Sequence, residues 1–220
     1  NNLILISLLL IIPISFISLE IDYLSLFRFS PLPLPNFIDF INAFKELPIT
    51  ELIYKTLSLT LLSASIAISI PPITLSISSN PIYLSIQSFI WLLFRIIPAP
   101  VTALLLLLSN IPSISVAALA LGLYNIGVLG KLLKENISQQ KKTLSKAMKT
   151  VGASDQVTWF YANLVPQSKN YLAFCAYRTD VILRETALVG IVGGVGLGWQ
   201  LQESLSSFDW AQVTVITLTF

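Results

Sequence analysis

Charged side chains occur inside a strongly apolar stretch at Arg178, Asp180, Arg184 and Glu185. A charge at the depth of a membrane span is costly, and it usually faces a cavity or a partner. At 100° per residue, Asp180 and Arg184 share one helix face as an i,i+4 pair, whereas Arg178 and Glu185 lie on the opposite side. These charges either neutralise each other and fix helix packing, or they provide a polar path for an anion. Arg95, in an earlier apolar run, presents the same two alternatives, with Asp180 as its candidate partner.

A second set of charges lies in the segment 131–169, which holds seven of the thirteen Lys and Arg residues and only two acids. Lys and Arg collect on the cytoplasmic side of membrane spans, so we expect a cytoplasmic loop here and the acid-rich segment 20–51 outside. A turn at 152–154 separates two short helical patterns, and Pro166 is expected to end the second. A long, structured, basic loop indicates a docking surface for a cytoplasmic partner.

Several kinds of chemistry are excluded by the residues that are missing. The chain has no histidine and one cysteine, which excludes histidine-based metal sites, catalytic triads and an internal disulfide. It has no GxxxxGK[ST] motif, so it cannot bind ATP as a P-loop protein does. The basic segment lacks Arg and a soluble domain, so it is not a nucleic-acid interface. We therefore expect no catalytic residue, metal or cofactor in this chain.

The composition is that of a membrane protein: 55% of residues are hydrophobic and 11% are charged. A soluble domain carries about 25% charged residues. The sequence predicts an all-α protein whose second span is interrupted at Pro71-Pro72 and whose third is bent at Pro98 and Pro100. The predicted spans are 3–19, 52–78, 83–108, 113–130 and 170–192, with 210–220 beginning a sixth.

The segment before the second span divides the chain into residues 1–51 and 52–220. Asn36 is expected to cap a short helix with Phe37, Ile41 and Phe44 on one face, lying along the outer interface. The chain begins without Met and stops inside an apolar run, so we expect it to be a fragment.

Two of the predicted spans contain several glycines. In the fourth span they are expected to be small packing positions, at Gly122, Gly127 and Gly130. A denser cluster should break the fifth span or turn it back, because several glycines weaken a helix. An outer loop at 199–209 is expected to follow. The residues of the cluster are Gly190, Gly193, Gly194, Gly196 and Gly198.

The basic loop resembles the EAA loop of binding-protein-dependent ABC importer permeases. That pattern is Glu-Ala-Ala, three residues, Gly, and a Leu-Pro after a second short helix. In this chain Lys146 stands in place of the usual Glu, and Pro166 lies one position further from the Gly. The residues that match the pattern are Lys146, Ala147, Met148, Gly152, Ala153, Leu164 and Pro166.

The flanking segments are similar to phosphonate permeases in particular. YRTDVILRETALVGIVGGVGLG (177–198) resembles their pattern Tyr-Arg-x-Glu-Val-x-x-Arg, followed by Gly-x-Val-Gly and a Gly-x-Gly ending. Three further segments resemble segments of the family. They are RIIPAP (95–100), the Gly-x-Leu-Gly-Lys match that ends at Lys131, and Lys55-Thr56-Leu57. The resemblance extends over residues 52–212.

The resemblance implies a type I ABC importer permease, a bundle of about six transmembrane helices with a coupling-helix loop at 138–168. It implies a transmembrane subunit that imports a phosphonate or related phosphorus oxyanion across the inner membrane of a bacterium. The implied partners are a second permease subunit (a homodimer), an extracytoplasmic binding protein, and a cytoplasmic ABC ATPase dimer that binds ATP and Mg. The loop residues would contact the ATPase, and the intramembrane charges would line the path along which the substrate crosses the membrane.

Two alternatives remain at this point. One is a permease for another small solute, of the methionine type. The other is a membrane scaffold that docks a cytoplasmic ATPase without transporting anything.

Overall fold

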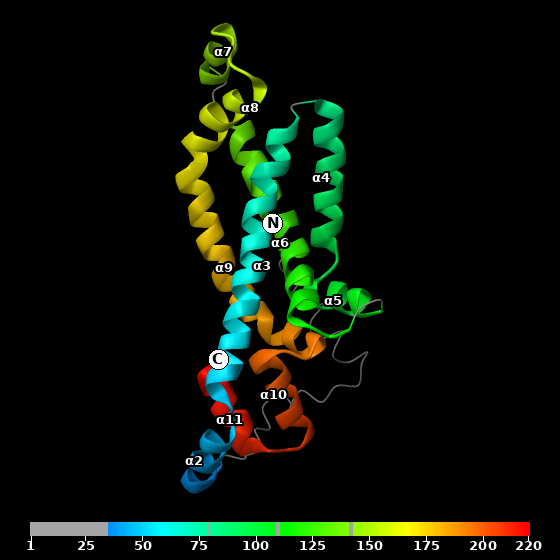
Figure 1. Ribbon diagram of the computed structural model, residues 1–220, viewed down its shortest axis with the longest axis vertical. Coiled ribbons are helices and arrows are strands. Elements are labelled where there is room, and N and C mark those ends of the chain that lie inside the picture. The colour runs from blue at the N-terminus through cyan, green and yellow to red at the C-terminus, as the bar shows by residue number, and fades with distance from the viewer. Residues whose placement is uncertain (1–34, 79, 109–110, 141–142) are drawn as a thin grey trace, which may run out of the picture. The chain divides into compact units, whose positions relative to one another are not determined.

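The computed structural model describes residues 35–78, 80–108, 111–140 and 143–220. The predicted first span, 3–19, lies outside the described residues. Asn36–Phe220 form one compact unit. Every element that the structure describes is a helix, which confirms the all-α prediction (Figure 1). The helices are α2 (Phe37–Glu46), α3 (Ile49–Ile77), α4 (Pro81–Ile96), α5 (Ala99–Leu107), α6 (Ile114–Ser138), α7 (Thr143–Thr150), α8 (Asp155–Thr158), the π-helix η2 (Trp159–Leu164), α9 (Val165–Gly193), α10 (Gly196–Ser206) and α11 (Trp210–Thr219).

The central helix of this unit is α6, which packs against α3, α4, α5 and α9 (Figure 1). Its side chains Leu121, Leu129 and Leu133 are fully buried. Gly127 and Gly130 permit the close approach of α4: an added Cβ would lie 2.5 Å from the carbonyl oxygen of Trp91 and 2.6 Å from its ring, respectively. The predicted packing role of these glycines is confirmed.

Helix α3 continues through Pro71 and Pro72, so the predicted interruption is wrong. A proline removes an i→i−4 hydrogen bond, and the two prolines free the carbonyls of Ala67 and Ile68. The hydroxyl of Tyr171, on α9, donates to the Ile68 oxygen at 2.7 Å. The neighbouring helix thus satisfies one of the freed groups, which is how membrane helices tolerate proline.

The predicted bends at prolines and glycines are confirmed. Helices α4 and α5 meet at 92° around Pro98, and the α9 segment meets α10 at 59°. Gly194 ends α9 in the left-handed region (φ +66°), and Gly196 follows with φ +70°. Glycine populates this region without steric cost.

Residues 196–206 form helix α10, so the outer loop predicted at 199–209 is wrong. Two contacts hold the start of α10 in place. The amide of Leu197 donates to the Thr56 hydroxyl of α3 at 3.0 Å. A Cβ at Gly198 would lie 2.2 Å from the Ala187 oxygen of α9, so only glycine allows this packing. Sequence reasoning missed the helix because its glycine-rich start suggested a loop.

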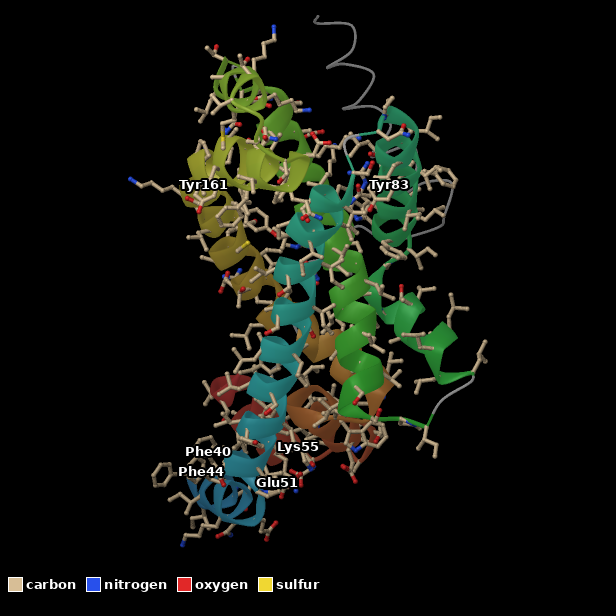
Figure 2. The ribbon with its side chains drawn as sticks, turned by 45° about the horizontal axis from the view of Figure 1, so that its top comes forward. Phe40, Phe44, Glu51, Lys55, Tyr83 and Tyr161 are labelled. Carbon is tan, nitrogen blue, oxygen red and sulfur yellow. The ribbon has the colours of Figure 1, made fainter. Side chains whose placement is uncertain are left out.

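Helix α2 forms where predicted and packs against α11, at the end of α3 that carries Glu51 and Lys55 (Figure 2). Its buried face contains Ala43, with Phe40 packed beside it. Phe37 and Phe44, on the predicted apolar face, are 77% and 55% exposed, and the predicted place of this face along the outer interface stays a prediction. The Asn36 side chain makes no capping hydrogen bond. The helix therefore has apolar residues on two faces, one packed and one open.

Two described helices, α3 and α6, are long and apolar enough to cross a membrane, and there are up to four spans if each bent pair counts as one. Helix α11 is apolar but shorter. The predicted total of about six spans includes 3–19, outside the described residues, and stays a prediction.

Candidate functional site

The basic segment is an ordered helical structure at one end of the unit, where Figure 1 shows α7 and α8. Helix α6 extends beyond its predicted end at 130 to Ser138 and so carries Lys131 and Lys134 out of the apolar run. Helix α7 has no buried residue. By contrast, Trp159 and Leu164 of η2 pack against the main core. The second half of the segment is therefore anchored, and α7 projects from it.

Gly152 makes the turn between α7 and α8. Its φ is +83°, its amide donates to the Lys149 oxygen, and the Ala153 amide donates to the Met148 oxygen. These two bonds are those of a Schellman motif, in which glycine ends a helix in the left-handed region. Ser154 then caps α8 by accepting from the Val157 amide. The predicted turn at Gly152, with a short helix before it, is confirmed, whereas the helix after it runs on through η2 into α9.

The residues that match the EAA pattern are divided between the two halves of the segment. Lys146 and Ala147 are exposed on α7, and Met148 is half-buried on the same helix. An ion pair between Lys149 and Asp155 (2.9 Å) joins α7 to the start of α8. No described atom lies within 4 Å of the position a Gly152 Cβ would take. This end of the unit therefore presents an open, positively charged surface around the turn.

Pro166 does not end a helix, which corrects the sequence prediction. It lies in the first turn of α9, directly after the π-helix of η2 and next to half-buried Leu164. A π turn is wider than an α turn, and a proline at the first turn of a helix removes no bond that the helix needs. The chain thus passes from the basic segment into α9 without a loop.

A buried polar network connects α9 to α6. Arg178 and Glu185 form an ion pair at 3.3 Å, with side chains 13% and 27% exposed. Asn125, fully buried on α6, accepts from the Arg178 Nε and donates to the Glu185 carboxylate at 3.4 Å. The Arg178 guanidinium also lies over the Tyr124 ring, 5.3 Å from its centre. The buried charges are thus paired and hydrogen-bonded, as a low-dielectric environment requires.

Asn125 and Tyr124 were missed by the sequence analysis. The available signal was a polar amide inside the otherwise apolar run 114–130. A buried amide needs partners, so its presence on a predicted span indicates a polar contact with another helix.

The second pair, Asp180 and Arg184, forms as predicted at 2.8 Å, but its side chains are 52% and 76% exposed. Asp180 therefore does not pair with Arg95, and that predicted contact is wrong. Arg95 instead shares a cavity of about 290 Å³ with Tyr124 and Glu185. The structure thus brings Arg95 and Glu185 of the buried pair to one cavity, whose lining includes neither Asp180 nor Arg184.

The glycine cluster has two structural roles. Gly194 and Gly196 supply left-handed backbone at the break. Gly190, Gly193 and Gly198 permit close contacts, such as the 2.9 Å that would separate a Gly193 Cβ from the Cβ of Ala117. Within the described ranges no group of His, Cys, Asp and Glu could hold a metal ion.

Known proteins similar to this chain are transport permeases, although no protein-family model matches it. HtxE of Stutzerimonas stutzeri, named as a phosphite transport system permease protein, is 32% identical over 126 residues, which are 57% of this chain and 48% of HtxE. The phosphate-import permease protein PhnE of Mycolicibacterium smegmatis is 36% identical over 40% of this chain and 16% of PhnE. The chain thus spans about half the length of HtxE and less of PhnE.

The fold is also found in a solved structure. A chain from the crystal structure of an amino acid ABC transporter with histidines aligns with a TM-score of 0.65 and 21% identity, covering 83% of this chain and 88% of that chain. The predicted ABC permease fold is confirmed, and the sequence relatives confirm the resemblance to phosphonate-type permeases.

Proposed function

We propose that this chain is the transmembrane subunit of an ATP-driven, binding-protein-dependent importer in a bacterial cytoplasmic membrane. The observation that carries the proposal is the Gly152 Schellman turn, which presents α7 at the end of a permease fold. The chain has no P-loop motif of its own, so energy must come from a partner. The proposed partners are a cytoplasmic ATPase dimer, a second permease subunit and an extracytoplasmic binding protein.

The proposed cargo is a phosphonate or a related phosphorus oxyanion. The names of the sequence relatives support this class, since they refer to phosphite and phosphate. The shared fold does not select the cargo, because the solved neighbour is an amino acid transporter. The cavity shared by Arg95, Tyr124 and Glu185 is our candidate section of the path, since a guanidinium can bind an oxyanion through two parallel hydrogen bonds.

In the proposed mechanism, ATP binding closes the ATPase dimer and displaces α7 and α8. Because Trp159 and Leu164 are packed on the core, this displacement is transmitted to α9. The break at Gly194 and Gly196 then allows α10 to change its angle to α9. Rigid movement of helix groups around a fixed site is a common form of alternating access.

Docking through the loop is tested by Gly152→Asp. The added side chain meets no described atom but strains the left-handed turn (φ +83°). Because both effects act on the exposed loop and not on a packed helix, the variant should insert at the normal level but lose ATPase binding and uptake. Gln202→Asp, which places the same charge at an exposed position of α10, is the matched control and should behave as wild type. The measurements are pull-down of the ATPase and substrate uptake. Undiminished ATPase binding with normal uptake in Gly152→Asp would remove the loop from the mechanism.

The proposed orientation, with 138–168 inside and 20–51 outside, has a separate test. Asn42 is exposed on α2, and the single native cysteine, Cys175, is buried. An impermeant thiol reagent should therefore label Asn42→Cys from outside in intact cells with little background. Labelling only after permeabilisation would reverse the orientation.

A further inference from the structure

A basic groove lies between α4 and α6, apart from the buried ion pair. It encloses about 300 Å³, and Arg95, Lys131 and Lys134 line it together with the hydroxyls of Ser88 and Ser138. A single water needs only about 10–15 Å³, so the groove can hold a much larger group.

The groove carries an excess of positive charge. Glu135 is its only acidic lining residue among the described residues, and it pairs with Lys131 at 3.5 Å with both side chains about half exposed. No described carboxylate pairs with Arg95 or Lys134. The Lys134 ammonium donates to the Leu84 oxygen at 3.1 Å and to Ser88. An ammonium has three N–H donors, so Lys134 retains one for a ligand.

The groove is lined by residues of α4 and α6, and its lining includes no residue of α3 or α9. A second cavity, lined by Leu75, Trp159 and Asn163 among others, includes residues of α3 and the basic segment and shares Lys134 and Ser138 with the groove. On the neighbouring outward face of α4, Phe89, Leu93 and Ile96 are 60%, 44% and 62% exposed. A phosphate-sized polar groove thus adjoins a continuous apolar helix face.

We propose that this groove binds the phosphate of an anionic phospholipid in the cytoplasmic leaflet. The assignment rests on the proposed function for its orientation, since the basic end of α6 must face the cytoplasm. Basic pockets between membrane helices on that side bind anionic lipid head groups. The three cations supply donors for the phosphate oxygens, and the apolar face of α4 contacts the acyl chains.

A free phosphate or phosphonate shares the oxyanion chemistry, but the surroundings favour a lipid. A small cargo ion does not need the apolar face of Phe89 and Ile96 beside its site. The candidate path cavity, with Glu185 and Tyr124, is a separate space that shares only Arg95 with the groove. The substitutions that test the groove therefore leave Arg95 unchanged.

The test uses the purified full-length chain in detergent, incubated with phosphatidylglycerol and examined by native mass spectrometry. The variant Lys131→Gln/Lys134→Gln should lose phosphatidylglycerol binding by roughly fivefold or more, since each basic residue near an anionic surface contributes about that factor. Lys131→Glu, at a half-exposed side chain, should show a similar loss without disturbing the Lys134 hydrogen bonds. Lys146→Gln/Lys169→Gln, with the same charge change at exposed positions elsewhere, should bind as wild type.

Two further arms distinguish the source of the oxyanion. Phosphatidylcholine should bind weakly to all four proteins, and inorganic phosphate should not displace phosphatidylglycerol from wild type. Displacement by phosphate would overturn the lipid assignment, and so would equal phosphatidylglycerol binding by wild type and both groove variants. Lipid binding is measured without the ATPase, so its failure is distinguishable from failure of the proposed transport function.

Discussion

Helix α9 carries two ion pairs that differ in almost every physical respect. Arg178 and Glu185 are seven residues apart, largely buried and joined through Asn125 to α6. Asp180 and Arg184 are four residues apart on the same helix and mostly exposed. The first pair links two helices, whereas the second is local to one. Sequence spacing alone predicted the second pair correctly and gave no information on the burial of either.

The comparison shows that the loss of folding stability on removing one charge of a pair depends on whether its partner is left buried or exposed to solvent. Breaking a buried pair leaves an uncompensated charge in a low-dielectric environment, and this typically costs about 3–5 kcal/mol. An exposed pair contributes about 0–1 kcal/mol because solvent screens it and side-chain entropy opposes it. The two pairs should therefore respond very differently to the same substitution.

The largest expected effect is that of Arg178→Ala. It leaves the Glu185 carboxylate without its paired cation and the Asn125 oxygen without its donor. Thermal unfolding of the purified subunit should therefore shift by the equivalent of about 3–5 kcal/mol. Arg178→Met/Glu185→Met should recover much of this stability, since both charges are then absent. If the double variant is no more stable than the single one, the pair is not the source of the effect.

The next effect concerns the connection between the helices. Asn125→Leu removes the amide that contacts both members of the buried pair, and we expect a loss of about 1–3 kcal/mol in stability. Asn170→Leu, at an exposed position on α9, is the control and should change stability little. Equal melting temperatures for the two variants would show that the network does not hold α6 to α9.

The exposed pair should be nearly neutral for folding. Arg184→Ala is expected to change stability by about 0–1 kcal/mol in the isolated subunit. Uptake separates its two interpretations: if Arg184 guides an anion, Asp180→Ala/Arg184→Ala should be normally folded but inactive. Normal uptake in this double variant would reject the anion role for the exposed pair.

A further effect, smaller than that of Arg178→Ala, is expected at Tyr124. Tyr124→Leu removes the ring beneath the Arg178 guanidinium and should cost about 0.5–2 kcal/mol, as measured by thermal unfolding. Tyr124→Phe keeps the ring and should be indistinguishable from wild type. A larger loss in the Phe variant would assign the contribution to the hydroxyl rather than to the ring.

The sequence predicted local geometry well and long-range partners poorly. Prolines and glycines impose backbone constraints that can be read without a structure, so the bend at Pro98, the break at Gly194 and the turn at Gly152 were found. The contact between Tyr171 and Ile68 joins residues 103 positions apart, and no local pattern indicates it. Pro166 was misread because its effect depends on the π turn before it, a feature without a sequence signature.

The hydrogen bond from Tyr171 to Ile68 has a mechanical consequence for α3. Two adjacent prolines remove two neighbouring hydrogen bonds from the helix, and this lowers its bending stiffness at that point. The Tyr171 hydroxyl restores one bond from outside, so that bending α3 away from α9 must first break it. The bending stiffness of α3 at its two prolines therefore depends on the position of α9. While the hydrogen bond is intact, a bend in α3 at this point must be accompanied by movement of α9.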